Sequence, residues 1–122
     1  MARRKNKHYD IVGGFVRIPK TMLDSKAWRV LSVEAKACLP LFLIKVHKKF
    51  DDAERYTEAF KFPYAEAERY RFHRDMFKQI IIDLESRGFI TVERGASLKN
   101  LKAGEKAGNR FKLSRSWERY EN

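Results

Sequence analysis

The chain has 122 residues, 43% of them hydrophobic, which suits a single domain with one core. Its net charge of +11 predicts a polyanionic partner. The sequence has no apolar run of ~18 residues, the length that a membrane-spanning helix needs. No signal-peptide pattern follows the basic start, and the single cysteine, Cys38, cannot form an internal disulfide. We therefore expect a cytoplasmic protein without a membrane partner.

The chain begins with a basic segment. Residues 1–8 hold four basic residues and no acidic one, and we expect residues 1–12 to form a flexible arm ahead of a single domain over residues 13–122. Residues 15–18 are mostly apolar and predict a short strand. Residues 22–29 predict a short helix that buries Met22, Leu23, Ala27 and Trp28.

The next segment predicts the central helix of the domain. Ser32 is a favourable N-cap and Glu34 complements the helix dipole, so the helix begins at Val33 and runs to about residue 48. It is apolar on most sides. Pro40 conflicts with a regular helix, and we expect one kinked helix rather than two short ones. Residues 49–61 predict a connection with a helical turn, and residues 60–62 a further short strand.

Residues 62–113 predict a short helix, a turn, a longer helix, a strand, a basic loop and a second strand. The longer helix spans residues 73–87, where an apolar stripe of helical spacing is formed by Phe77, Ile80, Ile81 and Leu84. We expect this stripe to pack against Ala67, Tyr70 and the helix that carries Phe42, and we expect Arg71, Asp75, Lys78 and Gln79 to point the other way. Gly88 ends the helix, and residues 89–92 follow as a β-branched and aromatic strand. Near the end of the chain, Trp117 and Tyr120 predict a last turn docked on the core.

The segment from Ala67 to Ile90 resembles the helix-turn-helix of GntR-type bacterial regulators and the winged helices of plasmid and phage replication proteins. The residues that carry the resemblance are Ala67, Tyr70, Phe72, Arg74, Phe77, Lys78, Gln79, Leu84, Gly88 and Ile90. It implies an α+β winged helix-turn-helix with three to four helices and a small antiparallel β-wing. Two positions depart from the pattern. Arg71 stands where glycine is usual, so that turn is strained or has another geometry, and Glu66 replaces an apolar residue.

The resemblance implies that the second helix of the motif reads double-stranded DNA. Polar side chains near its start would reach base edges in the major groove: His73, Arg74, Asp75, Lys78 and Gln79. Arg71, in the turn before this helix, is a further candidate for DNA contact. The alternative is that these residues form a solvated helix face, with Arg74 in a structural ion pair. Most of the remaining positive charge lies in the arm and the wing and suits phosphate contacts, through Arg3, Arg4, Lys5, Arg94, Lys99, Lys102, Lys106 and Arg110.

The sequence offers little support for catalysis. The three histidines are widely spaced and no ligand stands at a metal-binding interval from them, and phosphate-binding loops and nucleophile elbows are missing. Cys38 lies among apolar residues, which predicts that it is a small buried side chain of the core. We predict a protein that is not an enzyme and uses no cofactor or metal.

The predicted function is sequence-specific binding of double-stranded DNA, in a small transcriptional regulator or a replication-associated factor of a bacterium, plasmid or phage. One alternative is a winged helix that binds RNA or single strands, favoured if tyrosines such as Tyr9, Tyr64 and Tyr70 are exposed beside basic residues. Another is a winged helix that binds protein. The fold alone does not choose between them, and the sequence leaves open a homodimer.

Overall fold

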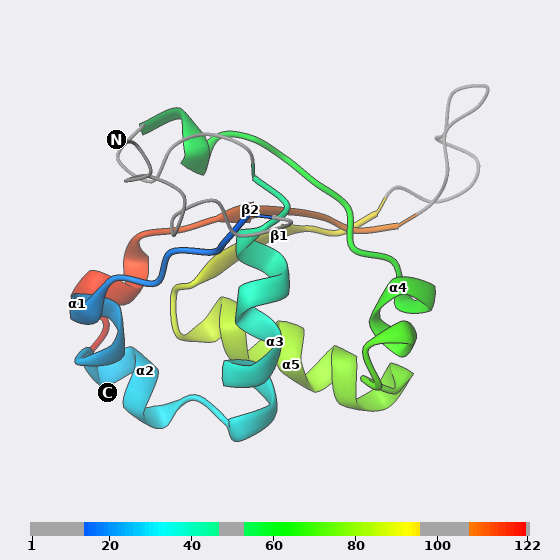
Figure 1. Ribbon diagram of the computed structural model, residues 1–122, viewed down its shortest axis with the longest axis horizontal. Helices are drawn as coiled ribbons and strands as arrows, with labels where there is room; N and C mark the ends of the chain where they lie inside the picture. Colours follow the sequence, from blue (N-terminus) through cyan, green and yellow to red (C-terminus); the bar gives the residue numbers. More distant parts are fainter. Residues whose placement is uncertain (1–13, 47–52, 96–107, 122) are drawn as a thin grey trace, which may run out of the picture.

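The computed structural model describes residues 14–46, 53–95 and 108–121 (Figure 1). The elements follow in the order α1 (Lys20–Leu23), α2 (Lys26–Val30), α3 (Val33–Leu43), the 3-10 turn η2 (Ala53–Tyr56), α4 (Tyr64–Arg69), α5 (Arg74–Ser86), β1 (Ile90–Glu93), β2 (Arg110–Leu113) and the 3-10 turn η4 (Ser116–Arg119). The described chain is α+β, and from residue 64 onward it has the predicted order of helix, turn, helix, strand and strand.

The single helix predicted over residues 22–29 is instead two helices, α1 and α2. Ser25 separates them, because its hydroxyl donates to the Met22 carbonyl at 2.6 Å and accepts from the Trp28 amide at 3.1 Å. This side chain therefore ends one helix and caps the next, which a helix-interior residue could not do. Met22 is buried as expected, but Leu23 is 42% exposed, so its predicted burial is wrong.

The two short strands predicted outside the hairpin are not formed. Residues 15–18 have no regular structure, and Phe15 is 58% exposed. β-Branched and aromatic residues form a strand only where they can pair with another strand and pack against a core. Over residues 60–62 only Phe60 pairs, through a single antiparallel bridge to Phe111 with N–O distances of 2.9 and 2.8 Å.

The prediction of one helix rather than two is confirmed, because α3 continues through Pro40. Ser32 accepts from the Ala35 amide at 3.1 Å as its N-cap. The helix ends at Leu43 rather than near residue 48. The amides of Lys45 and Val46 bond to carbonyls three residues back, which tightens the chain out of the α-helix. The part of the prediction beyond residue 46 lies outside the described residues.

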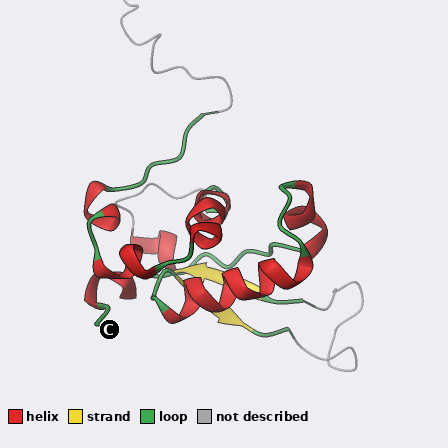
Figure 2. Cartoon of the chain, turned by 90° about the horizontal axis from the view of Figure 1, so that it is seen from below, coloured by secondary structure: helices red, strands yellow, loops and turns green. Residues whose placement is uncertain are grey.

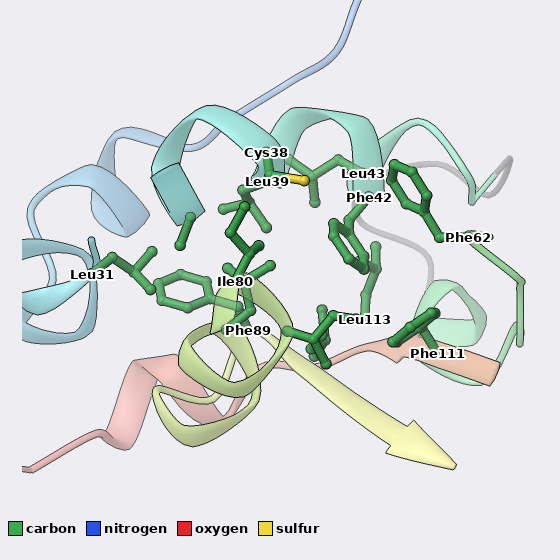
Figure 3. Packing of buried hydrophobic residues seen from close by; sticks show 14 of the residues in the cluster. Leu31, Cys38, Leu39, Phe42, Leu43, Phe62, Ile80, Phe89, Phe111 and Leu113 are labelled. Carbon is green, nitrogen blue, oxygen red and sulfur yellow. The ribbon is translucent and has the colours of Figure 1, made fainter. Parts of the chain in front are cut away.

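The core is centred on the ring of Phe42, which lies where α3 crosses the other elements (Figure 3). Its centroid is 4.9 Å from Phe62, 5.4 Å from Phe111, and 6.1 Å from both Phe60 and Phe77. These edge-on, tilted and stacked aromatic contacts stabilise the fold beyond the burial of apolar area alone. One side chain of α3 thereby contacts α5, the hairpin and the segment before α4.

Helix α5 has the predicted extent, with His73 as N-cap and Arg87 as C-cap, and it buries the predicted stripe of Phe77, Ile80, Ile81 and Leu84. At its end the Phe89 amide bonds to the Leu84 carbonyl and the Gly88 amide to the Glu85 carbonyl, the paired bonds of a Schellman motif. Gly88 has a φ of 92°, and a Cβ there would lie 2.5 Å from the Trp117 nitrogen.

Strands β1 and β2 form an antiparallel pair in the register Ile90 to Leu113 and Val92 to Phe111 (Figure 2). These side chains face the helices, whereas Thr91, Glu93, Arg110 and Lys112 are exposed on the other face. After the hairpin, Trp117 in η4 stacks on Phe89 with centroids 6.1 Å apart and planes 6° apart, and Tyr120 packs against the core. The predicted docked last turn is confirmed.

The burial pattern of α5 predicts how two substitutions in the same helix will differ. Phe77→Ala removes a ring that is 1% exposed and contacts Phe42, Phe62 and Tyr64, so it should lower the free energy of unfolding by about 3–5 kcal/mol. Ile82→Ala, at a side chain 51% exposed, should change it by no more than about 0.5 kcal/mol. Urea unfolding of both variants measures the difference, and equal losses would mean that the face of α5 is assigned incorrectly.

Candidate nucleic-acid interface

The turn between α4 and α5 is built around a strained arginine. Arg71 has a φ of 73°, and among the described residues it alone of the non-glycine residues has a positive φ. Its amide bonds to the Glu68 carbonyl at 2.9 Å, and the Phe72 amide bonds to the Ala67 carbonyl at 3.0 Å. This is the same Schellman pattern that Gly88 makes, with arginine in the position that favours glycine. The strain expected at this turn is confirmed.

One face of α5 remains exposed along its whole length. Asp75, Gln79, Ile82 and Ser86 follow one another at spacings of four, three and four residues, and Lys78 lies beside them. The prediction that Asp75, Lys78 and Gln79 point away from the core is confirmed. These side chains offer an anion, a cation and an amide on one rigid helix.

The start of α5 holds its first arginine over an aromatic ring. The guanidinium carbon of Arg74 lies 4.5 Å from the ring centroid of Tyr64, and Tyr64 in turn packs edge-on against Phe77 at 5.7 Å. His73 beside it is exposed and makes no side-chain cap of the helix. The stacking fixes the direction of the Arg74 side chain while leaving its residue exposed.

Tyr70 does not occupy the predicted place between the two helices. We expected it to pack against Phe77 and Ile81, but it is 47% exposed and lies between exposed Arg69 and Arg71. As the C-cap of α4 it has left the helical path, and Tyr64 and Phe62 fill the position against Phe77 instead. An exposed aromatic residue therefore lies between two exposed arginines along the chain of this turn.

The hairpin contributes a second set of cations. Arg94 forms two hydrogen bonds of 3.0 Å to Glu85 near the end of α5, so this predicted DNA-binding residue also ties the hairpin to the helix. Arg110 and Lys112 lie on the exposed face, across the strands from Glu93 and Thr91. The remaining predicted cations lie outside the described residues: Lys99, Lys102, Lys106, Arg3, Arg4 and Lys5.

The turn and the hairpin lie at one end of the molecule. In Figures 1 and 2 the end of the hairpin at which β1 ends and β2 begins lies on the same side as the α4–α5 turn, away from α1 and α2. The turn between α4 and α5 therefore lies at the same end of the molecule as the point where β1 ends and β2 begins.

The acidic residue that departs from the winged-helix pattern has a local partner. Glu66 accepts a hydrogen bond of 2.6 Å from Lys45, both side chains are about 20% exposed, and the Lys45 nitrogen lies 4.8 Å from the Phe62 ring centroid. The pair joins α4 to the end of α3. Glu66 therefore takes no part in the exposed surface of the turn.

The described residues contain no cluster of side chains that could hold a metal ion. No three of their His, Cys, Asp and Glu side chains cluster as a metal site, and none of their helices has the length and apolar character to cross a bilayer. Cys38 is fully buried, and burial raises the pKa of its thiol to about 12, so it stays protonated at neutral pH. This fits the core role predicted for it.

Three residues near the turn and on α5 are exposed although the sequence did not predict their exposure. Ile82 is the third of three consecutive isoleucines, and only its position off the Phe77–Leu84 stripe indicates that it faces solvent. Arg69 and Tyr70 belong to the short α4, where the sequence placed the tyrosine in the core. Their exposure depends on where α4 ends, which periodicity over six residues does not fix.

The geometry of the turn predicts a stabilising substitution. Arg71→Gly removes the Cβ clash of a positive φ, and we expect a gain of about 0.5–1 kcal/mol in the free energy of unfolding after the extra entropy of the unfolded glycine chain is subtracted. Arg71→Ala serves as the control, because it removes the guanidinium and keeps the strain. Thermal and urea unfolding compare the three proteins, and a glycine variant no more stable than the alanine variant would contradict the strained geometry.

Comparison of the chain with models of protein families, with characterised proteins and with solved structures finds no match.

Proposed function

We propose that the chain is a winged helix-turn-helix protein that binds double-stranded DNA, with α5 as its reading helix and the β1–β2 hairpin as its wing. The observation that carries the proposal is the exposed polar face of α5, whose start follows the arginine-bearing turn at the end of the molecule where β1 ends and β2 begins. The element order from α4 to β2 agrees with this fold.

The side chains on α5 match the hydrogen-bonding groups of base edges. At 13 residues the helix is about 20 Å long and fits the major groove. Arg74 and Lys78 can donate to guanine or phosphate, Gln79 can pair with adenine, and Asp75 can accept from cytosine. The stacking of Arg74 on Tyr64 supports a base contact, because a guanidinium already held in one direction loses less freedom on binding.

Charge on the turn and hairpin supplies the contacts that position a duplex. Arg71 in the turn and Arg110 and Lys112 on the hairpin are exposed, and they suit phosphate oxygens rather than base edges. The net charge of +11 favours association with DNA as a polyanion. We infer a small cytoplasmic regulator or replication-associated factor of a bacterium, plasmid or phage, which catalyses no reaction.

A second candidate is binding of single-stranded DNA or RNA, and Tyr70 is the observation that favours it. Its ring is half-exposed between Arg69 and Arg71, and an aromatic ring flanked by cations is the usual platform on which an unpaired base stacks. Selection from competing duplex, single-strand and RNA pools decides between the two. Tyr70→Leu should then weaken single-strand binding strongly and duplex binding little.

Duplex binding should depend steeply on salt. If about four to six phosphates are neutralised, the logarithm of the association constant should fall with the logarithm of salt concentration at a slope of roughly −4 to −5. Fluorescence anisotropy with a labelled duplex at several salt concentrations measures the slope. A flat titration, or no binding at low salt, would refute the proposed function.

Substitutions on α5 and on the hairpin should have different effects. Gln79→Ala should reduce preference for a selected site over random duplex by about 1–3 kcal/mol, because it removes a base contact. Lys112→Ala should weaken both duplexes about equally and make the salt slope shallower by nearly one unit, because it removes a phosphate contact. Competition binding tests both, and the roles of helix and hairpin are reversed if Lys112→Ala alters sequence preference and Gln79→Ala does not.

A further inference from the structure

The outer face of α3 carries an exposed apolar ridge. Val33, Ala37, Pro40 and Ile44 follow one another at spacings of four, three and four residues, which places them on one line along the helix. Val33 is 75% exposed and Ile44 46% exposed, Ala37 is exposed, and Pro40 is partly exposed. We call these four residues the α3 ridge. No polar side chain interrupts it, although 35% of the chain is charged.

The ridge lies opposite the face by which α3 enters the core. Cys38, Leu39 and Phe42 point from α3 toward α5 and the hairpin (Figure 3), and they are fully buried. In Figure 2, α3 stands at the margin of the molecule with no described element over its outer side. A contiguous exposed apolar strip of this kind marks a contact surface more often than isolated apolar residues do.

We propose that the α3 ridge binds the α3 ridge of a second copy of this chain, with the two helices antiparallel. The ridge is symmetrical about its own midpoint, because Val33 and Ile44 are equally far from it, as are Ala37 and Pro40. A twofold axis through that midpoint brings Val33 against Ile44 of the second copy and Ala37 against Pro40 of the second copy. The small Ala37 near the centre lets the helix axes approach closely.

The charges beside the ridge complement each other in this arrangement. Glu34 lies in the first turn of α3 and Lys45 follows its C-cap, so an acidic and a basic side chain stand at opposite ends of the ridge. The antiparallel twofold places Glu34 of one copy next to Lys45 of the other, where Lys45 already binds Glu66. It also places each helix N-terminus beside a C-terminus, which favours the opposed dipoles. A parallel pair would instead place both Glu34 side chains at one end of the contact and both Lys45 side chains at the other.

The size of the ridge predicts a weak, salt-strengthened dimer. Helix α3 has 11 residues and is about 16 Å long, so the contact falls in the class of small, transient interfaces. Each copy carries a net charge of +11, and this repulsion opposes association until salt screens it. Added salt should therefore strengthen self-association while it weakens DNA binding. A test of the dimer and a test of the proposed function can therefore fail separately.

Sedimentation of the full chain from about 10 μM to about 1 mM, at low and high salt, tests the proposal. We expect a reversible monomer–dimer equilibrium that shifts toward dimer at high salt. Val33→Glu should weaken it at least tenfold and still fold, because an acidic residue is favourable in the first turn of a helix. Leu23→Glu makes the same chemical change at an exposed leucine of α1 and should leave association unchanged. A chain that stays monomeric throughout, or equal effects of the two variants, would overturn the proposal.

Two mixing experiments test the geometry. Ala37→Glu and Ala37→Lys should each associate poorly alone, because like charges meet near the axis, and a mixture of the two should recover a dimer. For the orientation, Val33→Cys mixed with Ile44→Cys should form the mixed disulfide on oxidation, and the buried Cys38 should not react. A mixture that remains monomeric, or preferential coupling of Cys at position 33 to itself, rejects the antiparallel contact.

Discussion

The ring of Phe42 sets the relation between the elements of this protein. Its four aromatic neighbours come from the segment before α4, from α5 and from β2, with centroids between 4.9 and 6.1 Å away. Because rings pack favourably only in certain tilts and offsets, these contacts restrict the angles at which α5 and the hairpin can lie on α3. The packing of the core therefore places the start of α5 at the end of the molecule where β1 ends and β2 begins.

The two Schellman motifs have the same backbone geometry, but one has glycine and the other arginine at the position of positive φ. At the end of α5 a side chain is impossible, since a Cβ on Gly88 would lie 2.5 Å from the Trp117 nitrogen. At the end of α4 the turn is open to solvent, and Arg71 incurs only the penalty of its positive φ, about 1–2 kcal/mol for a residue other than glycine. Strained residues persist mostly where the side chain has a use, and an exposed guanidinium between the two helices of the motif is consistent with contact to an anion.

The sequence predicts the parts of this fold that local chemistry determines. The stripe of α5, the Ser32 cap and the glycine at the end of α5 depend on periodicity and capping, which act within a few residues. The split at Ser25, the unformed strand near Phe15 and the exposure of Tyr70 depend on what packs against each segment, which no local pattern contains. For the candidate site the same division holds: the polar residues of α5 were predictable, whereas their alignment with the hairpin and the stacking of Arg74 on Tyr64 required the assembled core.

Helix α3 illustrates why an apolar sequence can hide a surface. Its residues are apolar around most of the helix, so periodicity alone gives no preferred buried side and predicts only a central position. Packing assigns the side of Leu39 and Phe42 to the core and leaves the α3 ridge outside. Because α3 and α5 meet through their buried sides, the ridge and the exposed face of α5 point in different directions. A second copy on the ridge would leave both α5 faces uncovered, so self-association and contact with a nucleic acid use separate surfaces and do not exclude each other.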